Sequence, residues 1–195
     1  MKARDSGPLE FLGREFLSGG FLSMNLTSST AAHLPLPGWA YVPGETADAE
    51  PDHRTLGRAK ALVPAQFFGF VPTRHPALRY GMALNDAGYF WEAQEVLEAV
   101  WAAAPQRGRE RTLLRACIQI ANANLKLRMQ KPNATARLWR EALVEIDDLL
   151  ARRPPAPGGG FAGRFPAAQL ARLLKARLAQ PKLSKSDWIA FGSLV

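Results

Sequence analysis

The stretch Gly88–Trp101, GYFWEAQEVLEAVW, decides the fold that this chain is expected to adopt. It begins with aromatic side chains, continues apolar along one side, and carries glutamates at positions 92, 95 and 98. This spacing predicts an amphipathic helix over residues 89–104 that ends before Pro105. Gln94 and Glu98 are four residues apart and share one helical face, with Trp101 one turn further along. If the protein has a functional site, this face is where we expect it.

The apolar stripe of this helix predicts which of its polar residues are exposed. At about 100° per residue, Gln94 and Glu98 fall on the rim of the stripe, whereas Glu92 and Glu95 are predicted to point into solvent. A rim position can be half-buried and still reach a ligand. The stripe itself consists of Phe90, Ala93, Val96, Leu97, Val100 and Trp101.

Similar periodicity predicts further helices over residues 55–62, 76–87, 109–130, 133–152 and 167–179, with a tight turn at 131–133. No strand pattern is convincing, so we expect an all-α protein, an antiparallel bundle of four to six helices with short loops. Asn124 falls inside the wide apolar arc of the 109–130 helix, beside Cys117 and Ile120. A buried amide needs partners, and Gln94 and Glu98 are the nearest polar candidates if the two helices pack antiparallel.

Proline and glycine divide the chain into four parts. Residues 1–54 are expected to form an irregular, proline-rich N-terminal arm that Trp39 and Tyr41 anchor on the bundle. Residues 55–152 form the predicted helical core, 153–166 a Pro/Gly-rich linker, and 167–195 a basic C-terminal helix and tail. Met24 is a hypothetical alternative start of the chain, because the preceding segment has no recognisable pattern.

Composition narrows the class of protein. A chain of 195 residues with 47% hydrophobic and 22% charged residues is typical of a soluble globular domain. The one cysteine rules out a disulfide framework within the chain and favours a buried, inert thiol. The N-terminal segment is interrupted by charges and lacks the continuous apolar core of an export signal, and no stretch is long enough to span a membrane. We therefore expect a cytoplasmic protein with no membrane partner.

The net charge of +8 is concentrated toward the C-terminus. From position 151 onward only one acidic residue, Asp187, faces a series of basic residues, which are Arg152, Arg153, Arg164, Arg172, Lys175, Arg177, Lys182 and Lys185. Such a segment can bind nucleic acid through counterion release. A solvated surface is the favoured interpretation, because the interleaved aromatic residues of a single-strand binder are missing.

The segments AGYFWEAQEVLEAVW and ACIQIANANLKLRMQKPNATARLW resemble the domain of unknown function 309 family, over about residues 75–150. Members are small helical proteins of bacteria and archaea with no assigned activity. The resemblance implies a signature of a histidine, three residues, a glutamate, two residues and an aromatic, in which the histidine and glutamate are suspected of binding metal. In this chain Gln94 holds the histidine position, and the glutamate and aromatic are Glu98 and Trp101. Lys126 stands at a further position where relatives often carry histidine.

The substitution at position 94 argues against a metal site, because a glutamine amide is a weak ligand for zinc-like metals. His33, His53 and His75 are expected in loops at no metal-binding spacing, so neither a metal nor another cofactor is predicted. The preferred function is a non-catalytic helical binding or interaction protein of unknown partner, with a homo-oligomer left open. The alternatives are a metal-dependent or hydrolytic enzyme centred on Glu98, and nucleic-acid association through the basic C-terminal segment. The candidate ligand-binding residues are Trp91, Gln94, Glu98, Trp101, Asn124 and Lys126.

Overall fold

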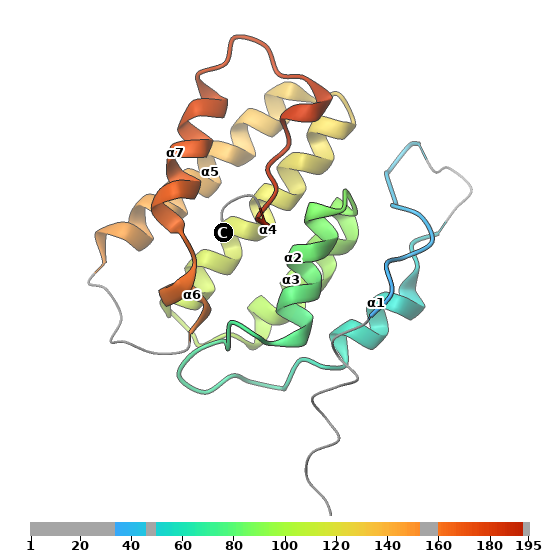
Figure 1. The fold of residues 1–195 in the computed structure, drawn as a ribbon, viewed down its shortest axis with the longest axis vertical. Coiled ribbons are helices and arrows are strands. Elements are labelled where there is room, and N and C mark those ends of the chain that lie inside the picture. The colour runs from blue at the N-terminus through green and yellow to red at the C-terminus, as the bar shows by residue number, and fades with distance from the viewer. Residues whose placement is uncertain (1–33, 46–49, 153–159, 193–195) are drawn as a thin grey trace, which may run out of the picture.

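The computed structural model describes residues 34–45, 50–152 and 160–192, and within these ranges the protein is all-helical. Figure 1 shows the helices packed side by side, with α7 and α6 on one side of the molecule and α1 with the N-terminal arm on the other. The all-α prediction is confirmed. The elements of the described ranges are α1 (His53–Lys60), α2 (Pro76–Asp86), α3 (Phe90–Ala103), α4 (Arg109–Arg128), α5 (Pro132–Ala151), α6 (Phe161–Arg164), α7 (Ala167–Leu178) and the 3-10 helix η2 (Lys185–Asp187).

Local signals explain where the helices begin and end. Pro76 and Pro132 stand in the first turns of α2 and α5, where a missing N–H costs nothing. The expected tight turn at 131–133 is therefore wrong, because Pro132 already begins α5. Gly88 takes a φ of 87° in the connection between α2 and α3, a conformation that favours glycine. At the other end of the core, Asp52 caps α1 by accepting the Thr55 backbone N–H at 3.0 Å.

His53 was expected in a loop, and this is wrong: it is the first residue of α1. His75 does lie outside the helices, immediately before α2. His33 falls outside the described residues.

The long helix α4 lies at the centre of the bundle, packed against α3 and α5. Two hydrogen bonds at opposite ends show that α4 and α5 run antiparallel. Arg109 donates to the Leu149 carbonyl at 2.9 Å, and the Thr135 hydroxyl donates to the Ala123 carbonyl at 3.3 Å. The largest fully buried side chains of the core include Trp139, Leu97, Leu113, Leu114, Ile120, Ile146 and Leu149.

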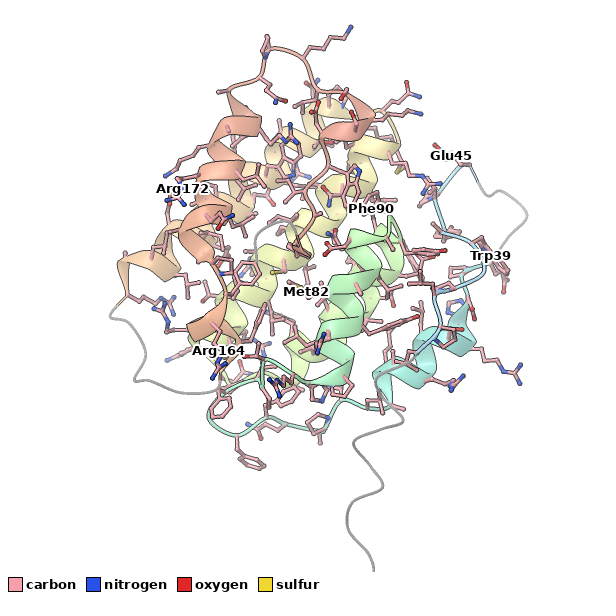
Figure 2. The ribbon with its side chains drawn as sticks, viewed as in Figure 1. Trp39, Glu45, Met82, Phe90, Arg164 and Arg172 are labelled. Carbon is pink, nitrogen blue, oxygen red and sulfur yellow. The ribbon has the colours of Figure 1, made fainter. Side chains whose placement is uncertain are left out.

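The N-terminal arm is fixed to the bundle by hydrogen bonds to its backbone and by apolar contacts. The Tyr80 hydroxyl donates to the Pro35 carbonyl at 2.7 Å. Val42 is buried in a small cluster with Phe90 and Leu125. Of the two residues expected to anchor the arm, Tyr41 packs against Trp91 at 5.2 Å, whereas Trp39 is 47% exposed and extends from the outer edge of the arm (Figure 2). Residues 1–33, with Met24, lie outside the described residues.

The C-terminal segment of residues 160–192 packs against the bundle. Residues 153–166 were expected to be a linker, but α6 lies inside this range and buries Phe161 and Ala162. After η2 the chain crosses back over α4 in Figure 1 and buries Ile189 and Phe191 in the main core. The division of the whole chain into four parts stays a prediction. In the described part of the chain, no helix is both long and apolar enough to cross a membrane.

Candidate functional site

Gln94 and Glu98 meet as predicted, at the surface of α3. The Gln94 side-chain amide donates to the Glu98 carboxylate at 3.0 Å. Glu98 is exposed and Gln94 is half-buried. The pair therefore links neighbouring turns of one helix, and the expected link through these residues to Asn124 on α4 is not formed.

Trp101 lies one turn away and is covered by an arginine of α4. The Arg111 guanidinium stacks 3.9 Å from the centre of the Trp101 ring. It also donates to carbonyls at the end of α3, those of Trp101 at 2.9 Å and Ala104 at 3.2 Å. The Trp101 carbonyl also accepts the Ala104 backbone N–H at 3.1 Å, and Arg111 adds side-chain donors to the carbonyls at the C-terminus of α3.

Asn124 is fully buried, as predicted, but its partners are different. Its amide donates to the Asn85 side-chain oxygen at 2.9 Å and to the Ile189 carbonyl at 2.8 Å, and its own oxygen accepts the Ile189 backbone N–H at 2.9 Å. Asn85 adds a second bond to the Ile189 carbonyl at 3.0 Å. The two asparagines thus hold the C-terminal segment against the core.

Glu92 was expected in solvent, and this is wrong: it is fully buried. One carboxylate oxygen accepts the Tyr41 backbone N–H at 2.7 Å, and the arm covers it. Burial raises the pKa of the Glu92 carboxyl above its ordinary value, although the bond from Tyr41 opposes the shift. Trp91 beside it packs its ring edge-on against Tyr41 at 5.2 Å, so it too belongs to the attachment of the arm.

The six predicted site residues therefore divide among separate environments. Lys126, the last of them, is half-buried on α4. Within the residues that the structure describes, no group of three or more histidine, cysteine, aspartate or glutamate side chains could hold a metal ion. Cys117 is fully buried, and burial raises the pKa of its thiol, as expected of an inert cysteine.

A different feature has the size and chemistry of a binding site. It is an open groove of about 420 Å³ between α2, α6 and the C-terminal segment, which we call the α2–α6 groove. Volumes of this order are typical of small-molecule sites. Its lining residues are Thr73, Leu78, Arg79, Met82, Ala83, Asp86, Phe161, Arg164, Phe165, Pro166, Phe191 and Gly192.

The floor of the α2–α6 groove is aromatic. Phe161 and Phe165 lie 5.3 Å apart edge-to-face, and Phe165 and Phe191 lie 6.4 Å apart in the same arrangement. Leu78 and Met82 of α2 form the facing apolar wall. In Figure 2, Met82 lies in the middle of the molecule and Arg164 at the edge of α6.

Two buried or half-buried carboxylates fix the walls of this groove. Asp86 accepts the backbone N–H groups of Phe191 and Gly192, each at 2.6 Å. Glu110 accepts the backbone N–H of Ala162 at 2.8 Å and so holds α6 to the start of α4. Burial raises the pKa of Glu110 to about 7, and the bond from Ala162 only partly offsets this.

Sequence reasoning missed the groove because its walls are far apart in the chain. The α2 side lies at positions 78–86, and the aromatic side comes from positions 161–165 and 191. The only indication of the groove in the sequence was the aromatic residues of the segments expected to be linker and tail. Nothing in the sequence told which helix they would cover.

Residues 78–138 match the model of a family described as a domain of unknown function (DUF309). The match begins in α2, includes all of α3 and α4, and ends in α5. It confirms the resemblance over this segment and attaches no activity to it. The replacement of a family histidine by Gln94 stays an expectation. The aromatic side of the α2–α6 groove lies outside the matched residues.

No curated protein and no solved structure matches the chain.

Proposed function

We propose that the protein is a non-catalytic helical binding protein whose binding site is the α2–α6 groove. The observation that supports this most is the groove itself, an open apolar depression of about 420 Å³ with charged residues at its edges. Sites of this kind bind the apolar part of a ligand in the depression and orient it with a few polar groups. The function of the matching family is unknown, so this proposal rests on the site alone.

The acidic residues of the molecule support a non-catalytic function. Carboxyls with a raised pKa are the usual candidates for acid or base catalysis. Among the residues that the structure describes, Glu92 and Glu110 are the carboxyls with a raised pKa, and each accepts a backbone N–H from a segment distant in sequence. Their hydrogen bonds fix the arm and α6, which is a structural role.

The two alternative functions have weaker support. An enzyme centred on Glu98 would have to use an exposed carboxylate whose nearest polar partner, Gln94, belongs to the same helix. Association with nucleic acid is weakened by pairing in the basic C-terminal part, where Arg152, Lys175 and Arg177 each face an aspartate. A bacterial cytoplasmic location, with or without self-association, remains part of the proposal, and the single cysteine fits a reducing compartment.

A groove-filling variant tests the proposal. Ala83 is exposed on α2 and lines the groove, so Ala83→Trp should fill the depression without disturbing the core. Ala102, an exposed alanine near the end of α3, is the matched control. Calorimetric titration with 1-octanol and octanoate should show binding to the wild type and to Ala102→Trp, and loss of at least about tenfold in affinity for Ala83→Trp. Absence of binding of both compounds to the wild type, or equal binding to both variants, would contradict the proposal.

A further inference from the structure

The charges around the α2–α6 groove are unevenly matched. Arg79 on α2 and Arg164 on α6 both line it, and both are exposed. Neither forms an ion pair with any carboxylate among residues 34–45, 50–152 and 160–192. Elsewhere in the same ranges some arginines do form ion pairs, as Arg115 does with Glu145 at 3.2 Å.

A second depression continues the groove and adds a third arginine. It measures about 480 Å³ and shares Thr73 and Arg164 with the α2–α6 groove. Its other lining residues are Phe70, Pro72 and Arg74, and Arg74 is likewise exposed and without an ion pair in the described part of the chain. Arg164 therefore stands where the two depressions meet, between the aromatic floor and Arg74.

Asp86, the one carboxylate that lines the groove, does not pair with these arginines. The oxygens of Asp86 already accept the backbone N–H groups of Phe191 and Gly192 and the side-chain amide of Asn85. Asp86 lies on α2 about two turns beyond Arg79. The groove is thus apolar along its floor and cationic toward Arg79, Arg164 and Arg74.

From this arrangement we infer that the α2–α6 groove takes a small amphipathic organic anion, with its apolar body on the Phe161, Phe165 and Phe191 floor and its anionic head at Arg79 and Arg164. This inference rests on the proposed function and adds the charge and shape of the ligand to it. Guanidinium groups bind carboxylate and phosphate oxygens through paired N–H donors, which gives an anionic head both energy and orientation. The size of the depression fits a small molecule better than a folded partner.

Ligands matched in length test the inference on the full chain. Octanoate, 1-octanol and octylamine share one apolar chain and differ in head charge. Calorimetry at low ionic strength should give octanoate at least about tenfold tighter binding than 1-octanol, and octylamine the weakest binding. Raising the salt concentration should reduce the octanoate advantage, because the arginines are exposed.

Arginine variants locate the head. In Arg79→Gln combined with Arg164→Gln, octanoate affinity should fall at least about tenfold while 1-octanol affinity is unchanged. Arg172→Gln, on α7 and well away from Arg164 in Figure 2, is the matched control and should bind octanoate like the wild type. Equal affinity of the wild type for octanoate and 1-octanol would overturn the inference and leave the proposed function standing. Absence of binding of octanoate and 1-octanol to the wild type would contradict both the inference and the proposed function.

A further titration distinguishes a small-molecule ligand from a peptide ligand. A capped tripeptide of phenylalanine, glutamate and leucine offers a similar charge and apolar surface. If it bound more tightly than octanoate in the same titration, the occupant would be a peptide, and the inference of a small molecule would be overturned.

Discussion

The side-chain amide of Asn124 donates to the side-chain oxygen of Asn85 across 2.9 Å in the interior of the bundle. Both residues also bond the backbone of Ile189, so α2, α4 and the C-terminal segment meet at one buried polar centre. Phe191, which closes the aromatic floor of the α2–α6 groove, follows two residues later. The hydrogen bonds of Asn85 and Asn124 therefore hold in place the segment that carries this aromatic side chain.

Removing the Asn124 amide should destabilise the fold. In Asn124→Leu the backbone N–H of Ile189 loses its partner and its carbonyl loses one of two, and a buried unsatisfied group costs about 1–3 kcal/mol. We expect the free energy of unfolding, measured in urea, to fall by about 2–3 kcal/mol. Gln119→Leu changes a half-buried amide on the same helix and should shift it by less than about 0.5 kcal/mol. Equal effects of the two changes would show that the Asn124 contacts are not formed.

Glu110 predicts a pH dependence of stability. Its pKa is about 7 in the folded protein, against 4.5 for an unperturbed glutamate. Between these values the folded state binds more protons at this site than the unfolded state does, so its stability falls as pH rises from about 4.5 to about 7. Relative to Glu110→Gln, whose amide oxygen can still accept the Ala162 N–H, the wild type should lose about 1–3 kcal/mol over this range. The measurement is a series of urea titrations at different pH values, and a constant difference between the two proteins would refute the assignment.

Glu92 should control the attachment of the N-terminal arm. Glu92→Leu removes the acceptor of the Tyr41 N–H and should speed hydrogen exchange of that amide by at least about tenfold. Glu95→Leu is the control, since Glu95 pairs with Lys60 at a half-exposed site and does not contact the arm backbone. Unchanged exchange at Tyr41 in Glu92→Leu, detected by two-dimensional NMR, would argue that the other contacts of the arm hold it without the Glu92 bond.

Glu98 should matter little for stability. Its side chain is exposed, and its bond to Gln94 stays within one helix. Glu98→Ala is expected to change the free energy of unfolding by less than about 0.5 kcal/mol. A loss above about 2 kcal/mol in chemical denaturation would restore the idea that Gln94 and Glu98 tie the central helices together.

The sequence was sufficient to predict the helices whose burial follows from their own apolar periodicity. The helices expected over 89–104 and 109–130 begin and end within two residues of α3 and α4, and Cys117 is buried as its apolar neighbours indicate. A stripe records only which side of a helix is apolar. It could not show that the arm would cover Glu92 and leave it buried.

Partners from distant segments were the other source of error. Asn124 was correctly expected to be buried and to need hydrogen bonds, but its partner Ile189 lies 65 residues away in a tail with no helical pattern. The same holds for α6, where only four residues form the helix and glycine and proline precede it. The groove depends on both segments, so it could not be predicted from local sequence.

The location of a bound anion is the most direct test of the account. In a two-dimensional NMR titration of the full chain with octanoate, the backbone shifts that change should cluster at residues 73–86, 161–166 and 188–192. Changes clustered instead around Gln94, Glu98 and Trp101, or spread over the bundle without a centre, would contradict the assignment of the binding site to the α2–α6 groove.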